Sequence, residues 1–305
     1  MRDLKGKTAF ITGGGAGIGL AMARTFAGEG MRVAIADLRQ DHLEEARAQL
    51  KAMGHDLLTF ELDVTDRSAM EAAASDVKRR MGPLNLLCNN AGVNIMRDVV
   101  DATYEDFDWM MAVNFGGCVN GVKAFLPDML AHDDWAHIVN TSSTAGVVPG
   151  PGTGPYSAAK FAIRGFTTAL RYDLMPHGIG VSVLCPGTTD TKLYESEENR
   201  LKRYEDKDGA AGAERRAFTG QLFREVLHKG MSAEAVAERV AEAVKANEFY
   251  IFPHAEFKAE FKEQFDEILN ALPKRPPDPD WMELEDGRRQ RTRDVVANAK
   301  VRGQA

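Results

Sequence analysis

The stretch Thr12-Gly13-Gly14-Gly15-Ala16-Gly17-Ile18-Gly19 decides the fold. An apolar run over residues 8–11 comes directly before it, and a helical pattern over residues 20–27 follows at once. Glycines let the backbone turn tightly and approach a pyrophosphate, whose charge is stabilised by the N-terminus of the following helix. The order of strand, glycine-rich turn and helix therefore predicts a dinucleotide-binding unit, and a plain turn without a ligand is the weaker interpretation.

Short apolar runs alternate with helical patterns along most of the chain. Several runs are apolar almost throughout, as expected for parallel strands that helices cover on both faces. We therefore expect a doubly wound α/β fold with a Rossmann-type parallel sheet of about seven strands and helices on both faces. Its ligands should lie beyond the carboxyl ends of the strands. The expected strands are residues 8–11, 33–36, 57–62, 84–88, 137–141, 181–185 and 249–252, and the expected helices include residues 20–27, 41–53, 67–81 and 156–176.

Composition excludes several classes of protein. The chain has 305 residues, 44% of them hydrophobic and 27% charged, which argues against global disorder, and its net charge of −7 argues against a nucleic-acid partner. Three cysteines in apolar runs, Cys88, Cys118 and Cys185, predict reduced thiols in a cytoplasmic protein. Cysteines and histidines form no cluster with metal-ligand spacing, and the sequence contains no membrane-length apolar run.

Two segments depart from the strand and helix alternation. Residues 192–230 are dense in charge but carry an amphipathic stretch, so we expect a mobile substrate lid there. Residues 256–305 begin with a helical pattern that contains Phe257, Phe261 and Phe265, and a proline-rich piece and a basic end follow. We therefore expect one catalytic domain over residues 1–255 and a C-terminal helical and proline-rich extension over residues 256–305.

The second expected strand ends at Asp37, 18 residues after Gly19. A carboxylate at this place accepts hydrogen bonds from the adenosine ribose hydroxyls and repels a 2′-phosphate, which favours NAD over NADP. Arg39 is the one opposing feature, because a guanidinium pairs with a phosphate. A helix cap is the alternative role of Asp37.

Tyr156 and Lys160 are four residues apart and therefore lie on one face of a helix. An ammonium group beside a phenol lowers its pKa, and such a phenol is the acid or base needed when an alcohol and a ketone interconvert. Ser143 stands 13 residues before Tyr156, and Ser142 is the competing serine.

With these motifs the chain resembles the short-chain dehydrogenase/reductase family over about residues 5–255. The resemblance implies that Tyr156 is the general acid and base, that Lys160 lowers its pKa and binds the nicotinamide ribose, and that Ser143 polarises the substrate oxygen. Asn114 would position a water that links Lys160 to solvent. The implied cofactor contacts are Gly13, Gly17, Ile18, Gly19, Asp37, Asp63, Val64, Asn90, Tyr156, Lys160 and Thr191.

The C-terminal extension and the segments around residues 103–109 and 249–253 resemble a narrower group, the bacterial Cα-dehydrogenases of lignin-derived β-aryl ethers. An NAD(H)-dependent alcohol dehydrogenase for a bulky aryl substrate is therefore expected. A reductase of steroid-like or other bulky ketones that uses NADP, and a nicotinamide-binding sensor without catalysis, remain alternatives. The family resemblance also implies a homotetramer or homodimer through the helices that begin near Asp106 and Tyr156.

Overall fold

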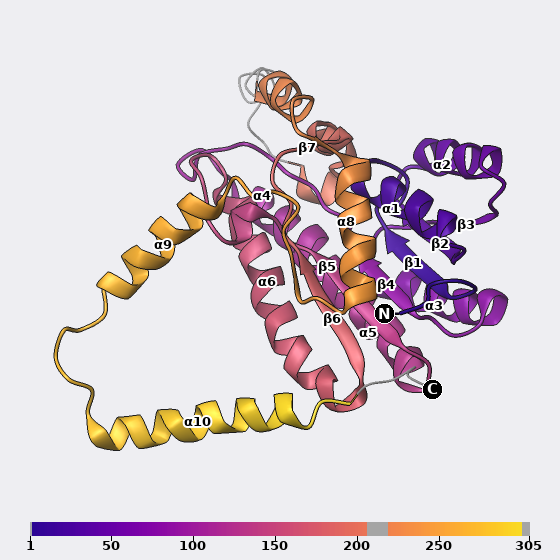
Figure 1. Ribbon diagram of the computed structural model, residues 1–305. Helices are drawn as coiled ribbons and strands as arrows, with labels where there is room; N and C mark the ends of the chain where they lie inside the picture. Colours follow the sequence, from indigo (N-terminus) through magenta and orange to yellow (C-terminus); the bar gives the residue numbers. More distant parts are fainter. Residues whose placement is uncertain (1, 206–218, 301–305) are drawn as a thin grey trace.

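Seven parallel strands form the centre of the protein (Figure 1). The computed structural model describes residues 2–205 and 219–300. The strand order is β3-β2-β1-β4-β5-β6-β9, so the chain moves outward in one direction from β1 and then crosses to the other side through β4. The strands are β1 (Thr8–Thr12), β2 (Arg32–Asp37), β3 (Leu57–Glu61), β4 (Leu86–Asn89), β5 (Ala136–Thr141), β6 (Ile179–Leu184) and β9 (Tyr250–Ile251). The predicted doubly wound fold and its seven strands are confirmed.

Helices cover both faces of the sheet because its central strands are apolar and buried on both sides. One buried cluster joins the sheet to three helices, and a second cluster joins its opposite face to three others. The first set is α1 (Gly17–Gly28), α2 (Gln40–Ala52) and α8 (Ala233–Ala246), and the second is α3 (Arg67–Met81), α5 (Gly117–Leu130) and α6 (Gly154–Leu174).

Observed boundaries differ from the expected ones at a few places. The run 84–88 forms a strand only from Leu86, and just before it the side chain of Asn85 accepts the backbone N–H of Thr8. Helix α6 starts at Gly154, before Tyr156, since Pro155 suits the first turn of a helix. The last strand is limited to Tyr250–Ile251. A small parallel pair, β7 (Thr189–Asp190) and β8 (Met231–Ser232), was not expected.

After β6 the chain forms one wall of the expected ligand site at the carboxyl ends of the strands. Short 3₁₀ turns, η4 (Lys192–Asn199) and η5 (Lys202–Tyr204), form the first part of the predicted lid. We call residues 192–205 the lid segment. Residues 206–218 of the predicted lid lie outside the described residues, and the chain is helical again from residue 219. Earlier in the chain, helix α4 (Tyr104–Met110) continues through a π-helical turn, η1 (Met111–Gly116), into α5, and a 3₁₀ turn, η2 (Thr144–Gly146), follows β5.

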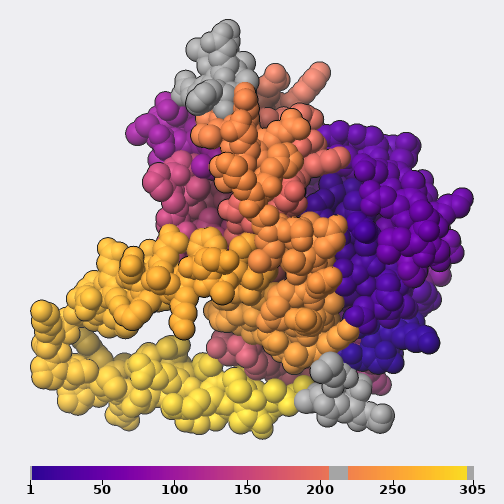
Figure 2. Space-filling model, turned by 45° about the horizontal axis from the view of Figure 1, so that its top comes forward, coloured from indigo at the N-terminus to yellow at the C-terminus, as the bar shows by residue number. Residues whose placement is uncertain are grey.

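The C-terminal extension is an arch of two helices, α9 (Lys258–Asn270) and α10 (Pro279–Ala297), joined by the proline-rich piece. Figure 2 shows an opening between this arch and the rest of the molecule. Phe261 packs on Phe252 with ring centroids 5.3 Å apart, whereas Phe265 is half-exposed. The C-terminal end of the arch is also attached to the rest of the protein, because the backbone N–H of Lys300 donates to the carbonyl of Met175. Phe261 therefore packs against the rest of the protein, whereas Phe265 remains largely in contact with solvent.

Within the described ranges, no helix is both long and apolar enough to cross a membrane.

Candidate active site

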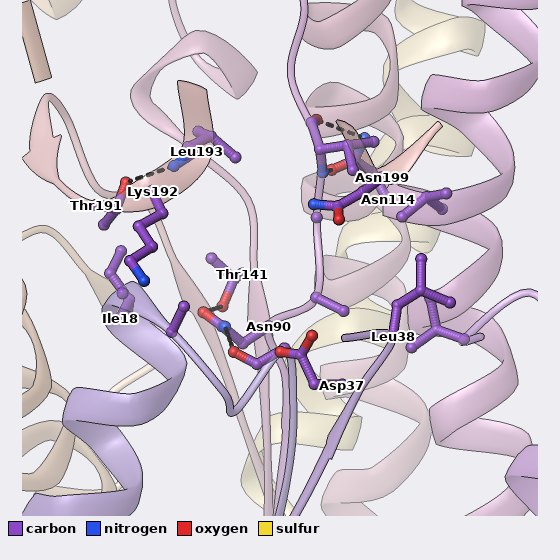
Figure 3. Close-up of a pocket in the computed structure, with 18 of the residues that line it drawn as sticks. Ile18, Asp37, Leu38, Asn90, Asn114, Thr141, Thr191, Lys192, Leu193 and Asn199 are labelled. Carbon is purple, nitrogen blue, oxygen red and sulfur yellow. Dashed lines mark hydrogen bonds between the residues drawn. The ribbon is translucent and has the colours of Figure 1, made fainter. Parts of the chain in front are cut away.

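One cavity lies at the carboxyl ends of the strands and encloses about 1320 Å³ of space, its open mouth included. Figure 3 shows Asn90 and Thr141 at the strand ends, between Ile18 on one wall and Asn114 on the other. Thirteen site residues were predicted from the sequence, and the cavity brings together twelve of them. They are Gly13, Gly17, Ile18, Asp37, Asp63, Val64, Asn90, Asn114, Ser143, Tyr156, Lys160 and Thr191. Gly19 is the exception and lies beneath the turn.

The glycine turn forms a cradle that side chains would fill. Gly13 has a φ of +62°, and a Cβ there would come within 2.8 Å of the Cα of Ala91. A Cβ on Gly19 would lie 2.0 Å from the carbonyl oxygen of Gly13, so Gly19 serves close packing instead of lining the cavity. No side chain caps the N-terminus of α1, which leaves the N–H groups of its first turn available to an anion. This geometry fits the pyrophosphate of a dinucleotide.

Asp37 stands at the end of β2 and points back over the turn. Its Oδ2 accepts the backbone N–H of Gly15 at 3.0 Å, and its Oδ1 accepts that of Arg39 at 3.1 Å. The carboxylate is 13% exposed, so it faces the cavity while its position is fixed by backbone donors. Such a group can accept hydrogen bonds from ribose hydroxyls.

Asp63, Val64 and Asn90 lie further along the same edge. Asp63 accepts from the backbone N–H and hydroxyl of Thr65, at 2.9 and 2.8 Å. Asn90 ties neighbouring strand ends together: its backbone N–H donates to Thr12 Oγ1 at 3.0 Å, and its Oδ1 accepts from Thr141 Oγ1 at 3.4 Å. Val64 is buried. These residues form a rigid surface at the strand ends, on which a flat and partly apolar part of a ligand can lie.

Ser143, Tyr156 and Lys160 meet where η2 and α6 face each other. The Ser143 hydroxyl lies near enough to the Tyr156 phenol to favour its ionised form and so to lower its pKa. The Nζ of Lys160 lies 5.4 Å from the centroid of the Tyr156 ring and donates to the carbonyl of Thr141 at 3.0 Å. Ser142 is turned away, since its hydroxyl donates to the backbone carbonyl of Lys160 at 2.7 Å. The three side chains thus form a contiguous group at the cavity wall.

Burial sets the pKa of both ionisable groups in this cluster. It raises the pKa of Tyr156 to about 12, although the hydroxyl of Ser143 acts in the opposite direction. It also lowers the pKa of Lys160 to about 8. Burial is the largest cause of the shift in Tyr156, and the lowering of its pKa by Lys160 stays a prediction.

Asn114 occupies the π-helical turn η1, a distortion that often marks functional sites. Its Nδ2 donates to the carbonyls of Val93 and Met110, at 3.1 and 3.0 Å, and its Oδ1 accepts the N–H of Val93 at 3.2 Å. A Cβ on Gly92 would meet both Asn114 Oδ1 and Lys160 Nζ, at 2.7 and 3.4 Å. The side chains of Asn114 and Lys160 thus both lie close to the backbone of Gly92.

The β6–β7 loop covers the catalytic cluster from the far side. The carbonyl of Pro186 accepts the Ser143 hydroxyl at 3.4 Å. His254, just before the C-terminal extension, accepts the N–H of Gly187 and is bonded to the carbonyl of Thr188, both at 3.0 Å. Thr191 follows β7 directly, and its methyl-bearing carbon lies against Gly17, where an added Cβ would be 3.0 Å away. The segment that leads into the extension therefore supports the β6–β7 loop.

The lid segment is attached on both sides of the cavity by arginine side chains. Arg200 is nearly buried and shares the fully buried Asp106 with Arg97, at 2.7 and 2.6 Å. It also stacks over the Trp109 ring at 4.4 Å. Arg203 forms an ion pair with Asp63 at the opposite edge. These attachments hold the first part of the predicted lid over the site.

Several cavity residues were missed by the sequence interpretation. Lys192, Leu193, Asn199 and Leu201 come from the lid segment, and Trp109 comes from α4. The charge density at residues 192–230 indicated a lid, but nothing in its spacing identified which side chains face inward. Among residues 2–205 and 219–300, no group of three or more histidine, cysteine, aspartate or glutamate side chains could hold a metal ion.

Known proteins similar to this chain agree with the function that the geometry indicates. A model of the short chain dehydrogenase family matches residues 7–202. A C alpha-dehydrogenase from Sphingobium sp. is 33% identical over 298 residues, which is 97% of this chain and 94% of that protein. The similarity thus extends through most of the C-terminal extension.

Two solved structures have the same fold. A putative short-chain dehydrogenase from Novosphingobium aromaticivorans aligns with a TM-score of 0.82 at 35% identity, covering 98% of this chain and all of that one. A short chain dehydrogenase/reductase from Burkholderia phymatum in complex with NAD aligns with a TM-score of 0.84 at 31% identity, covering 91% and 100% of the two chains. The chain therefore belongs to the short-chain dehydrogenase/reductase family, oxidoreductases that work with a nicotinamide cofactor.

Proposed function

We propose that this protein interconverts a secondary alcohol and a ketone with NAD(H), and that Tyr156 transfers the proton. The observation that carries the proposal is that Ser143, Tyr156 and the buried Lys160 meet at the wall of one cavity that also contains the glycine turn. A phenol next to a second hydroxyl can hold a carbinol or carbonyl oxygen and move its proton.

The glycine cradle and the residues along the strand ends would hold the cofactor. The first turn of α1, with Gly17 and Ile18, suits the pyrophosphate, and Asp37 suits the adenosine ribose. Asp63 and Val64 would flank adenine. Asn90 and Thr191 would contact the nicotinamide end, and Lys160 its ribose.

In alcohol oxidation, a nicotinamide bound in this cavity would supply the acceptor for the hydride that leaves the carbinol carbon, as the family resemblance implies. Tyr156 takes the hydroxyl proton and Ser143 holds the oxygen that becomes the carbonyl oxygen. In ketone reduction Tyr156 returns the proton as a phenol, the form that its raised pKa favours. Positive charge beside the ring favours the phenolate needed for oxidation, and Lys160 is the nearest source of it in the chain. Asn114 would position a water that links Lys160 to solvent.

NAD preference is supported by Asp37 and by the surroundings of Arg39. Asp37 would repel a 2′-phosphate, and the guanidinium of Arg39 already contacts the carboxylates of Asp41, Glu195 and Glu198.

A bulky aryl alcohol is the proposed substrate, such as the benzylic Cα alcohol of a lignin-derived β-aryl ether. The name of the Sphingobium relative supports oxidation at an α carbon. The main cavity supports a bulky ligand, because the apolar side chains of Trp109, Leu193 and Leu201 also line it.

The test is formation of reduced cofactor with a panel of aryl secondary alcohols, β-aryl ether dimers included, measured with NAD and NADP in parallel. Turnover of the dimers with NAD is the expected result. Turnover only of steroid-like or aliphatic alcohols would support the proposed reaction but exclude an aryl ether as the substrate. Cofactor binding without turnover of any alcohol would overturn the proposed reaction and favour a sensor.

We further propose a single catalytic domain over residues 1–255, a cytoplasmic location and a homotetramer or homodimer through α4, α5 and α6. The three thiols are free and buried, which supports a reducing compartment. Phe161 on α6 is partly exposed, as a residue at such an interface would be in an isolated chain. Light scattering of the purified protein tests the oligomer, and a monomeric mass would contradict it.

A further inference from the structure

The lid segment is tied to the turn after β2 by a cluster of charged side chains. Arg39 contacts Glu195 and Glu198 of η4, each at 3.3 Å between Nη1 and a carboxylate oxygen. Two further guanidinium nitrogens of Arg39 donate to Asp41, at 3.1 and 2.6 Å. One cation thus serves three carboxylates, two of which come from a segment about 156 residues further along the chain.

The partners of Arg39 differ in burial. The side chain of Glu195 is 19% exposed and that of Arg39 is 27% exposed, whereas Asp41 and Glu198 are about two-thirds exposed. Glu195 therefore makes the least screened of these ion pairs. The same carboxylates hold the pKa of Arg39 above its ordinary value.

His42 extends the cluster to the residue proposed to bind the ribose. Its Nδ1 lies 4.0 Å from Asp37 Oδ1, and its Nε2 lies 3.9 Å from Glu195 Oε2. Both Asp37 and His42 line the cavity, so the lid carboxylate Glu195 is only one side chain away from the ribose end. A phosphate entering here would meet four carboxylates around one guanidinium.

We infer that Glu195 and Glu198 are specificity-determining residues, which keep Arg39 from pairing with the 2′-phosphate of NADP(H). Asp37 then sets NAD preference by direct repulsion, and the lid segment sets it by occupying the guanidinium of Arg39. This inference rests on the proposed NAD preference. It makes cofactor choice depend on the segment that also covers the substrate.

The test measures the dissociation constants of NADH and NADPH by fluorescence titration, without turnover. In the double variant Glu195→Gln, Glu198→Gln we expect the ratio of the NADPH to the NADH constant to fall about tenfold, the sum of two modest ion-pair effects. Adding Arg39→Gln to this double variant should restore the wild-type ratio, because the gain requires the released guanidinium. Glu44→Gln, on the exposed face of α2, is the matched control and should leave the ratio unchanged.

An unchanged ratio in the double variant would overturn the inference, and so would a fall that persists without Arg39. Should the double variant unfold, Glu198→Gln alone serves, because this side chain is largely exposed, and a fall of about threefold is expected. Equal affinity of the wild-type protein for NADH and NADPH would instead refute the proposed NAD preference, whatever the variants show.

Discussion

The two walls of the active-site cavity are held by different forces. On the sheet wall, Asn114, Ser143 and Lys160 are buried, and their side chains bond to backbone groups. On the lid wall, Arg39 and Arg203 hold their partners by ion pairs that are partly open to water. Neutral bonds to buried backbone change little with salt, whereas exposed ion pairs are screened. The sheet wall therefore holds the proposed catalytic side chains in fixed positions, whereas the lid wall can adjust to the ligand.

The largest expected effect lies on the sheet wall. Tyr156→Phe removes the hydroxyl that is proposed to transfer the proton, and kcat should fall by about 10³-fold or more. NADH should still bind, as fluorescence titration would show. Tyr172→Phe changes the same residue type on the same helix, at a position that does not line the cavity, and should keep its rate. Substantial activity in Tyr156→Phe would contradict the proposed mechanism.

Asp106 is the exception on the lid wall, because its ion pairs are fully buried. Asp106→Asn removes the charge shared by Arg97 and Arg200, and the free energy of unfolding should fall by about 3 kcal/mol, since two guanidinium groups lose a buried carboxylate. Asp108→Asn, an exposed neighbour, should change it by less than about 0.5 kcal/mol. Urea unfolding measures both, and equal losses would show that burial does not distinguish these sites.

The sheet wall should also give a pH-dependent stability. Burial lowers the pKa of Lys160 to about 8 from an ordinary 10.5, so between these values the unfolded chain binds more protons than the folded one. The penalty for a buried charge is full below pH 8 and vanishes as the pH rises to 10.5.

Relative to Lys160→Met, the wild-type protein should therefore gain up to about 3 kcal/mol of stability over that interval. Urea unfolding of both proteins below pH 8 and near pH 10.5 measures the difference. A constant difference would mean that Lys160 is not desolvated.

The smallest effect is expected where the lid segment meets Asp63. Arg203 is about half-exposed, and Arg203→Gln should lower the free energy of unfolding by less than about 1 kcal/mol. Added salt should reduce even this difference, because it screens the wild-type pair. A loss comparable to that of Asp106→Asn would erase the contrast between exposed and buried lid contacts.

Local patterns were sufficient to predict the fold and most of the site. The glycine turn, the alternation of strands and helices and the spacing of Tyr156 and Lys160 each depend on neighbours a few residues apart. Parallel strands then carry Asp37, Asp63 and Asn90 to one edge of the sheet, as the predicted topology requires.

The sequence by itself thus determined the doubly wound sheet, the ligand edge and most of the predicted side chains that line the cavity. Only the tertiary structure decided how that edge is covered. Arg39 meets Glu195, and Arg200 meets Asp106, across long separations in the chain, and no periodic pattern encodes such pairs. The burial that raises the pKa of Tyr156 likewise depends on packing among α4, α6 and the loop after β4, because desolvation is a property of the assembled surroundings and not of neighbouring residues in the sequence.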